Sequence, residues 1–238
     1  MSEIMDRRAL KKARTRDRVR TVAQRMFAEG DFDSVTIADI AREADVAVQT
    51  VFNHFTTKEE LFFDGRTPWV AGPADAVRDR MPSMPPLTAL REYLVGTVRD
   101  LVSSLGQPDR RCYVGTLEAS DALRAHEREL VHETELRLRS ALVDAWSADA
   151  SPAAPADPET AATLVAASWL STARTLVVTQ RTAMMDDADP AVLADRVLDM
   201  ADRLFRHFEA GVAVVHGRGQ GSTYGDTGWP PVAMRRAG

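Results

Sequence analysis

Three hydrogen-bonding side chains lie close together in the stretch 47–53, which reads AVQTVFN. The amides of Gln49 and Asn53 can each donate and accept a hydrogen bond, and this pattern matches the edge of an adenine. Thr50 adds a hydroxyl that can reach a base or a phosphate. These residues predict recognition of base edges through hydrogen bonds. The alternative interpretation is the polar surface of a small helix.

The surrounding stretch, 36–63, predicts three short helices that would hold these side chains in place. Thr36 can cap the first helix, whose apolar residues recur at helical spacing between 37 and 44. Residues 45–47 form a tight connection, and a second helix follows with its apolar side on Val51, Phe52 and Phe55. Two short helices joined in this way form a helix-turn-helix, whose second helix lies in the major groove of DNA.

A basic helix precedes this stretch. The pattern predicts a helix over 12–29, ended by Gly30, so residues 8–56 should close one compact helix-turn-helix domain. Residues 1–28 contain nine Lys or Arg against three acids, although the whole chain carries a net charge of −5. We expect an N-terminus that faces an anion on an otherwise acidic body. Arg14, Arg16 and Arg18 would add affinity that falls with salt, unless they only form a solvated helix face.

The remainder of the chain predicts a helical bundle over 57–210 and a disordered, glycine-rich tail over 211–238. Residues 64–86 are interrupted by prolines and predict a hinge and a connecting loop. A flexible linker is expected at 147–158. Further helices are expected over 87–105, 110–120, 121–146, 158–180 and 190–210. The predicted fold is all-α, with about nine helices and a small N-terminal domain on a larger bundle.

The composition argues against a secreted or membrane-spanning protein. Cys112 is the only cysteine, so no intrachain disulfide can form, which fits the reducing cytoplasm. The basic N-terminus is not followed by the apolar segment of a secretory signal. The apolar stretch from Thr163 to Val178 is too short to span a bilayer and carries Arg174. We therefore predict a cytoplasmic protein without a membrane partner.

The sequence also argues against an enzyme and against a bound cofactor. It shows no nucleophile–base pair and no phosphate-binding loop, and its five histidines are scattered among helices. Glu129, His132 and Glu133 have a helical spacing that could hold a metal ion. Their charge-rich surroundings make a solvated surface the preferred interpretation.

Residues 14–63 resemble the DNA-binding domain of the TetR family of transcriptional regulators. The matching segments, in order, are AEG at 28–30, TIADIA at 36–41, ADV at 44–46, TVFNHF at 50–55 and KEEL at 58–61. The resemblance implies a two-domain homodimer that binds an operator with its N-terminal helices. It further implies a bundle that dimerises through its last two long helices and encloses a small-molecule pocket.

Three positions depart from the usual pattern of this family. Ala47 and Val48 stand where Ser or Thr and a polar or basic residue are frequent, so the second helix lacks its usual cap. Phe52 stands where a Tyr is frequent, which removes a phenol that could bind phosphate. Val48 offers an apolar contact, for example to a thymine methyl group. These differences affect which operator is read more than whether DNA is bound.

The predicted DNA contacts combine the polar face with helix ends. Thr36 and Lys58 lie at helix N-termini, which attract phosphate, and His54 would do the same if exposed. Phe52 would either pack against the sugar-phosphate backbone or fill the core. The full predicted set is Thr36, Val48, Gln49, Thr50, Phe52, Asn53, His54 and Lys58.

A ligand site is predicted on the bundle helices, with core packing as the alternative for each of its residues. The predicted lining is Trp69, Tyr93, Tyr113, Leu117, Trp169 and Thr172. Arg174 would pair across a dimer interface, anchor an anion or reach to solvent, and we favour a structural pair. Cys112 could sense oxidants but more commonly behaves as a small hydrophobic residue.

Two functional hypotheses follow. The first is a repressor that a small-molecule ligand releases from duplex operator DNA. The second is a DNA-binding dimer that acts without a small molecule, through a protein partner or as an architectural protein. An enzyme is the least favoured class.

Overall fold

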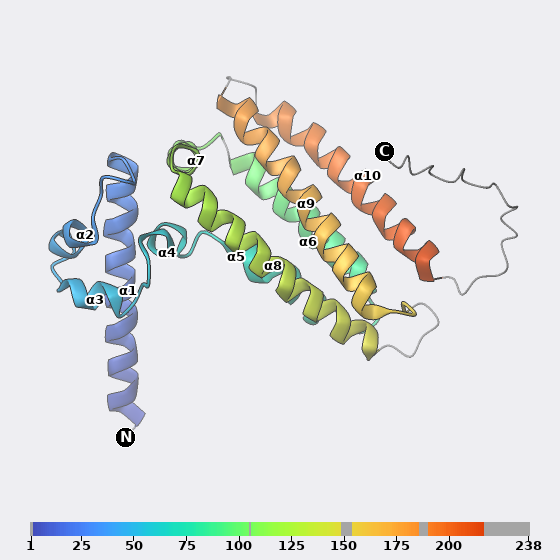
Figure 1. Cartoon of the computed structure of the whole chain (residues 1–238), viewed down its shortest axis with the longest axis horizontal. Helices are drawn as coiled ribbons and strands as arrows, with labels where there is room; N and C mark the ends of the chain where they lie inside the picture. The colour runs from blue at the N-terminus through green and yellow to red at the C-terminus, as the bar shows by residue number, and fades with distance from the viewer. Residues whose placement is uncertain (1, 105, 149–153, 186–189, 217–238) are drawn as a thin grey trace, which may run out of the picture.

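The computed structural model describes residues 2–104, 106–148, 154–185 and 190–216, and within these ranges all regular secondary structure is helical. The all-α prediction is confirmed. Figure 1 shows α1–α4 at one side of the molecule and the long helices of the bundle at the other. The described helices are α1 (Ser2–Glu29), α2 (Ile37–Glu43), α3 (Val48–Phe52), α4 (Lys58–Phe63), α5 (Pro68–Arg78), α6 (Pro86–Ser104), α7 (Pro108–Ala119), α8 (Asp121–Ser147), α9 (Pro158–Met185) and α10 (Pro190–His216).

The N-terminal helices close around a small aromatic core. Phe27 at the end of α1, Phe32 in the following loop and Phe62 in α4 have ring centroids 4.9 to 6.1 Å apart. Ile40 of α2 and Val51 of α3 are fully buried in the same cluster. The short helices α2, α3 and α4 are therefore held by packing, because helices of this length are not stable alone.

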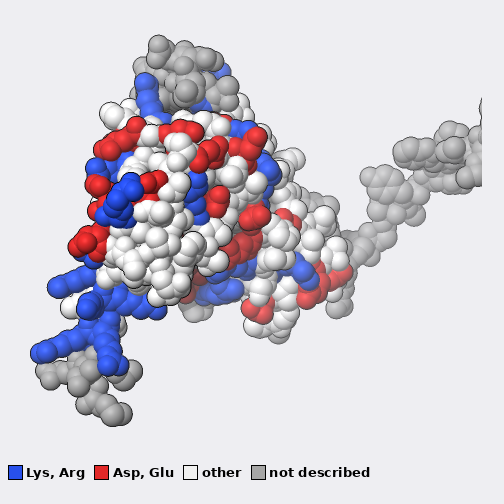
Figure 2. All heavy atoms as spheres, turned by 60° about the vertical axis from the view of Figure 1, so that its left-hand side comes forward, with Lys and Arg blue, Asp and Glu red and all other residues white. Residues whose placement is uncertain are grey.

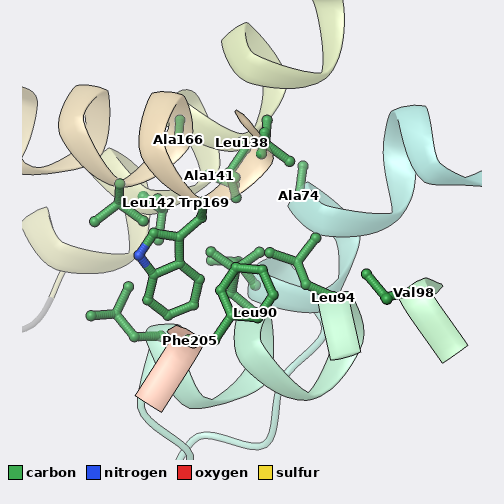
Figure 3. Packing of buried hydrophobic residues seen from close by; sticks show 14 of the residues in the cluster. Ala74, Leu90, Leu94, Val98, Leu138, Ala141, Leu142, Ala166, Trp169 and Phe205 are labelled. Atoms are coloured by element: carbon green, nitrogen blue, oxygen red, sulfur yellow. The ribbon is translucent and has the colours of Figure 1, made fainter. Parts of the chain in front are cut away.

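The bundle has its own core, which is centred on Trp169 of α9 (Figure 3). Trp169 is fully buried and packs against Phe205 of α10, with ring centroids 5.4 Å apart. Leu90 of α6 and Leu138 of α8 close the cluster from the other sides. The Arg91 guanidinium of α6 donates hydrogen bonds to the carboxylates of Asp202 and Glu209 on α10.

Helix α5 was not predicted, because its prolines suggested a loop. Pro68 lies at its first position, where the missing N–H costs nothing. Val70, Ala74 and Val77 recur at helical spacing and are buried, and their burial outweighs the hydrogen bond that Pro73 removes inside the helix. Non-helical backbone in the predicted hinge and loop region is therefore confined to 64–67 and 79–85, and a hinge motion there stays a prediction.

Several helices are longer than the sequence pattern indicated. Helix α1 begins at Ser2 rather than at residue 12, and α10 continues to His216, so residues 211–216 are helical. The rest of the predicted tail, 217–238, and part of the predicted linker, 149–153, lie outside the described residues.

Helix α9 contains a segment, Pro158–Arg181, that is long and apolar enough to cross a membrane by composition alone. Its apolar residues Val165, Ala166 and Trp169 instead lie in the core of the bundle. The segment is therefore buried on one side, while Leu164 on its other side is exposed.

The two parts of the molecule share a packed interface. Leu117 and Tyr113 of α7 and Leu123 of α8 belong to the apolar cluster of α1–α4. The ring of Tyr113 stacks on Phe62 of α4 with a centroid distance of 4.9 Å and an interplanar angle of 11°. Helix α7 is thus packed directly against the core of the N-terminal helices.

Candidate functional site

Helix α3 presents a mixed polar and apolar face to solvent. Val51 is fully buried and anchors the helix, whereas Val48 and Phe52 are 42% and 49% exposed. Gln49 and Asn53 are also exposed, and the Gln49 amide donates to Asn53 Oδ1 at 3.2 Å. Phe52 therefore does not fill the core. The exposed face combines two amides with two apolar groups, which are among the side-chain types that can contact base edges in a major groove.

The turn before α3 fixes its direction. Asp45 adopts a left-handed conformation with φ of 50°, which Asp tolerates better than most residues. The Val46 N–H then donates to Ala41 O at 3.0 Å and closes α2. Ala47 is extended and gives α3 no side-chain cap, as its residue type predicts. The arrangement is a helix-turn-helix.

Thr36 and Lys58 both form contacts within the chain. The Thr36 hydroxyl accepts a hydrogen bond from the Asp39 N–H at 3.1 Å, and the Asp39 carboxylate reaches back to the Thr36 N–H. Lys58 Nζ lies 2.8 Å from Phe32 O and 3.1 Å from Val35 O. The capping prediction for Thr36 is confirmed. Lys58 stabilises the 30–36 connection, and its contact with phosphate stays a prediction.

Arg16 is a positioning residue that the sequence did not reveal. Its guanidinium donates to His54 O at 2.5 Å and to Asp64 Oδ1 at 2.6 Å, and it lies 4.1 Å above the Phe55 ring. It thus joins α1, the end of α3, which is the second helix of the helix-turn-helix and its recognition helix, and the end of α4. The expectation that Arg16 is a free phosphate contact, equal to Arg14 and Arg18, does not fit this environment.

The face of α1 that points toward α3 carries Lys12 rather than Arg14 or Arg18. Ala9, Lys12 and Arg16 line a hollow together with Asn53 and His54. Burial lowers the pKa of His54, and the positive charges of Lys12 and Arg16 lower it further.

Two residues along a helix correspond to a rotation of about 200°, so Arg14 and Arg18 point away from that hollow. Figure 2 shows Lys and Arg side chains gathered at the projecting end of the molecule, which is the N-terminal half of α1 in Figure 1.

A second hollow lies inside the bundle, between α5, α6, α7, α8 and α9. The inner cavity has a volume of about 80 Å³. A wider outer hollow of about 620 Å³ shares several of its lining residues. Three of the predicted ligand residues, Trp69, Tyr93 and Tyr113, line both.

The other three predicted ligand residues do not line this cavity. Leu117 is fully buried among the N-terminal helices, and Trp169 is fully buried in the bundle core. Thr172 lies on another face of α9, where its hydroxyl donates to Ser168 O at 2.8 Å. Spacing places Trp169 and Thr172 near one another, but only packing decides which face of α9 meets the cavity.

The charged residues of the cavity were largely missed from the sequence. Arg181 and Glu127 form a buried ion pair, with guanidinium–carboxylate distances of 2.7 and 3.2 Å. Arg110 and Arg174 also line the inner cavity. Arg174 has no ion-pair partner among the residues that the structure describes, and its pairing across a dimer interface stays a prediction. Arg110 lies three residues before Tyr113 on α7, and this helical spacing was the sequence signal that Arg110 shares a face of α7 with the predicted ligand residue Tyr113.

Tyr113 belongs to both the cavity and the N-terminal core. Its burial raises its pKa to about 12, so the phenol is neutral at physiological pH. Its ring contacts Phe62, and Thr116 on the same helix lies 3.5 Å from Phe27 O. The half-buried Cys112 lies 3.5 Å from Ala28 O. The wall of the cavity is therefore also a contact surface for α1 and α4.

Within the described ranges, no group of three or more His, Cys, Asp or Glu side chains could hold a metal ion.

Comparison with known families gives a match over residues 20–64 to the model described as "Bacterial regulatory proteins, tetR family". A comparison with curated proteins gives no match.

Among solved structures, NalD, the secondary repressor of the MexAB-OprM multidrug efflux pump in Pseudomonas aeruginosa, is 22% identical. That match covers 81% of this chain and 96% of NalD, with a TM-score of 0.49. GusR of Salmonella enterica is 20% identical over 81% of this chain and 95% of its own, with a TM-score of 0.47. SmeT in complex with triclosan is 19% identical over 79% of this chain and 89% of its own, with a TM-score of 0.50. At this level of identity, the likeness to SmeT concerns the fold alone.

Proposed function

We propose that this chain, which belongs to the tetR family of bacterial regulatory proteins, is a homodimeric repressor that a small molecule releases from its operator. The family assignment carries DNA binding through the helix-turn-helix. Repression, dimerisation and release by a ligand are the parts that we add. Such a protein acts in the cytoplasm, where the DNA is.

The observation that carries the proposal is the exposed face of α3. A short helix that is anchored by the buried Val51 and presents Gln49 and Asn53 has the groups that distinguish adenine in the major groove. Exposed Phe52 on the same face fits the methyl group of thymine or the sugar of the backbone. Lys12 and Arg16 of α1 lie beside Asn53 at this face, and the basic half of α1 would supply the attraction to phosphate that does not depend on sequence.

Dimerisation would follow from the exposed faces of the last two helices. Leu164 of α9 is 59% exposed and Met200 of α10 is 47% exposed. Small side chains, including Ala167 and Ser171, lie on the same exposed face of α9 and would allow a close approach of two helices. A two-fold dimer would place two α3 helices about 34 Å apart in successive major grooves.

Release by a ligand would act through α7 and α4. A molecule in the cavity would contact Tyr113, which stacks on Phe62 of α4. Asp64 ends that helix and is held by Arg16, which also binds the backbone at His54 beside the recognition helix. The ligand shifts the population away from the dimer conformation whose two α3 helices fit the DNA only if it binds a conformation with a different spacing of these helices more tightly.

The test is transcription in vitro from a promoter that overlaps a duplex selected by the chain from random sequence. We expect added protein to lower the transcript yield and the complex to have the mass of two chains on one duplex. An increase of transcription, or a single chain on the selected duplex, would contradict the proposal.

The small size of the inner cavity supports a second candidate. Ligand sites for small molecules commonly have volumes of roughly 300–1,000 Å³, whereas the inner cavity has about 80 Å³ and only the open outer hollow, of about 620 Å³, falls in that range. A DNA-binding dimer controlled by a protein partner needs no cavity. If a broad panel of small molecules leaves both the melting temperature and the operator affinity unchanged, this candidate replaces the ligand-released repressor.

A further inference from the structure

Arg110 places a guanidinium in the wall of the cavity, and no carboxylate of the described residues forms an ion pair with it. Its Nε atom is buried and forms no hydrogen bond with the described part of the chain. Its guanidinium lies 4.7 Å from the centre of the Tyr113 ring, and burial lowers the pKa of Arg110. The Arg110 side chain is half-buried, and a charge that is partly withdrawn from water without a partner carries a desolvation cost. An anion at this point would supply the missing partner.

The carboxylates nearest to this wall are already occupied. Both oxygens of Glu127 bind Arg181, and Glu118 lies 3.5 Å from the same guanidinium. The inner cavity is lined by three arginines and one glutamate, which leaves an excess of two positive charges. Such a wall favours an anionic ligand over a neutral or cationic one.

A second arginine lies where the inner cavity meets the outer hollow. Arg66 lines the outer hollow, and its guanidinium lies 5.0 Å from the centre of the Tyr113 ring, beside which Arg110 also lies. Among the described residues, Arg66 has no ion-pair partner either. Tyr113 is a neutral phenol and can donate a hydrogen bond, so three donors converge on one region of the wall.

The rest of the inner cavity is mainly apolar, with Thr97 and Thr134 adding hydroxyl groups. Leu94, Val98, Leu101, Leu170 and Val177 line it, and its volume of about 80 Å³ leaves room only for a compact group. From this juxtaposition we propose that the cavity binds a small organic acid, whose apolar or aromatic body enters the inner cavity while Arg110 binds its acid group. This inference rests on the proposed function, since it names the chemical class of the releasing ligand.

The experiment compares acids with their neutral amides on the full chain by isothermal titration calorimetry. The pairs are benzoate with benzamide, phenylacetate with phenylacetamide, and 2-naphthoate with 2-naphthamide. We expect at least one acid to bind roughly tenfold or more tightly than its amide, because charge-assisted hydrogen bonds are about twice as strong as neutral ones. Arg110→Gln should abolish this preference and Arg110→Lys should keep part of it.

The matched control is Arg111→Gln, which removes the same charge from the adjacent, exposed residue. It should leave the preference for the acid unchanged. A cooperative thermal unfolding transition shows whether each variant is folded. If Arg110→Gln is not folded, the comparison of acid with amide on the wild-type chain still tests the inference. Equal affinity for acid and amide, no binding of any of the acids, or an unchanged preference in Arg110→Gln would overturn the inference.

The failure of this inference is distinguishable from failure of the proposed function. Operator affinity is measured in parallel by fluorescence anisotropy for each compound. Tight binding of an acid without loss of operator affinity keeps the anion site and contradicts ligand-induced release. Release by an amide as effective as its acid keeps the proposed function and contradicts the anion site.

Discussion

Replacing Arg16 with Met tests whether this arginine positions the recognition helix or merely contacts DNA. The substitution keeps a long apolar stem beside Phe55 but removes the hydrogen bond to His54 O and the ion pair with Asp64. It also leaves Asp64 with only Arg20, whose guanidinium is 3.8 Å away. The variant should therefore lose folding stability even when no DNA is present.

The magnitude follows from three contacts of Arg16, because its fourth contact, an exposed ion pair with Glu60 at 3.7 Å, adds little. The side chain of Arg16 is 37% exposed, so its ion pair with Asp64 contributes about 1 kcal/mol after solvent screening. The hydrogen bond to the carbonyl of His54 adds about 1 kcal/mol, and the contact with the face of Phe55 adds about 0.5 kcal/mol. We expect the free energy of unfolding to fall by about 2–3 kcal/mol.

The assay is urea denaturation, with Arg18→Met as the matched control. Arg18 is exposed on the other side of α1 and has no hydrogen bond or ion pair with the described part of the chain. The free energy of unfolding of the Arg18→Met variant should fall by less than about 0.5 kcal/mol. Equal stability of the two variants would refute the positioning role of Arg16 and return it to the group of solvated basic residues.

Three further predictions concern the DNA-facing side of α1, the pH response and the cavity. Lys12→Gln should lower operator affinity and reduce the slope of log affinity against log salt by about 0.9, measured by anisotropy, whereas Arg18→Gln should leave the slope unchanged. The pKa of His54 is depressed in the folded chain, so folding should lose stability as the pH falls through about 6.5, the pKa of an unperturbed His. In denaturation at pH 7.5 and 5.5, His54→Gln should lose less stability than the wild type, and an equal loss would contradict this. A Cβ atom on Gly72 would lie 1.8 Å from the Tyr93 hydroxyl. Gly72→Ala should therefore displace that ring and change ligand affinity in calorimetry, and unchanged affinity would show that Tyr93 does not touch the ligand.

The helix-turn-helix was predictable because its signals are local. Thr36 and Asp39 cap α2 within four residues of each other, and the apolar positions of α2 and α3 follow the helical period. The resemblance over residues 14–63 adds the order of these segments. The contacts of Arg16 and Lys58 were not predictable in the same way, because they join residues 23 to 48 positions apart.

The bundle was less predictable because its sequence signals are ambiguous. Helix α5 contains Pro73, and the rule that proline breaks helices was outweighed by three buried apolar residues. Trp169 lies on a helix that is apolar nearly all round, so the sequence did not show whether it faces the core or the cavity. The unpaired position of Arg110 depends on Arg181 reaching Glu127 from another helix, and only the assembled bundle shows it.

The central claim is that α3 reads DNA sequence through Gln49 and Asn53. The most direct measurement is selection from random duplex DNA with the wild-type chain and, in parallel, with the Gln49→Ala/Asn53→Ala variant. We predict that the wild type enriches a two-fold symmetric site with half-sites about 10 base pairs, or a multiple, apart. The variant should lose preference at specific positions within each half-site. No enriched site with the wild type, or the same site with both proteins, would contradict the account.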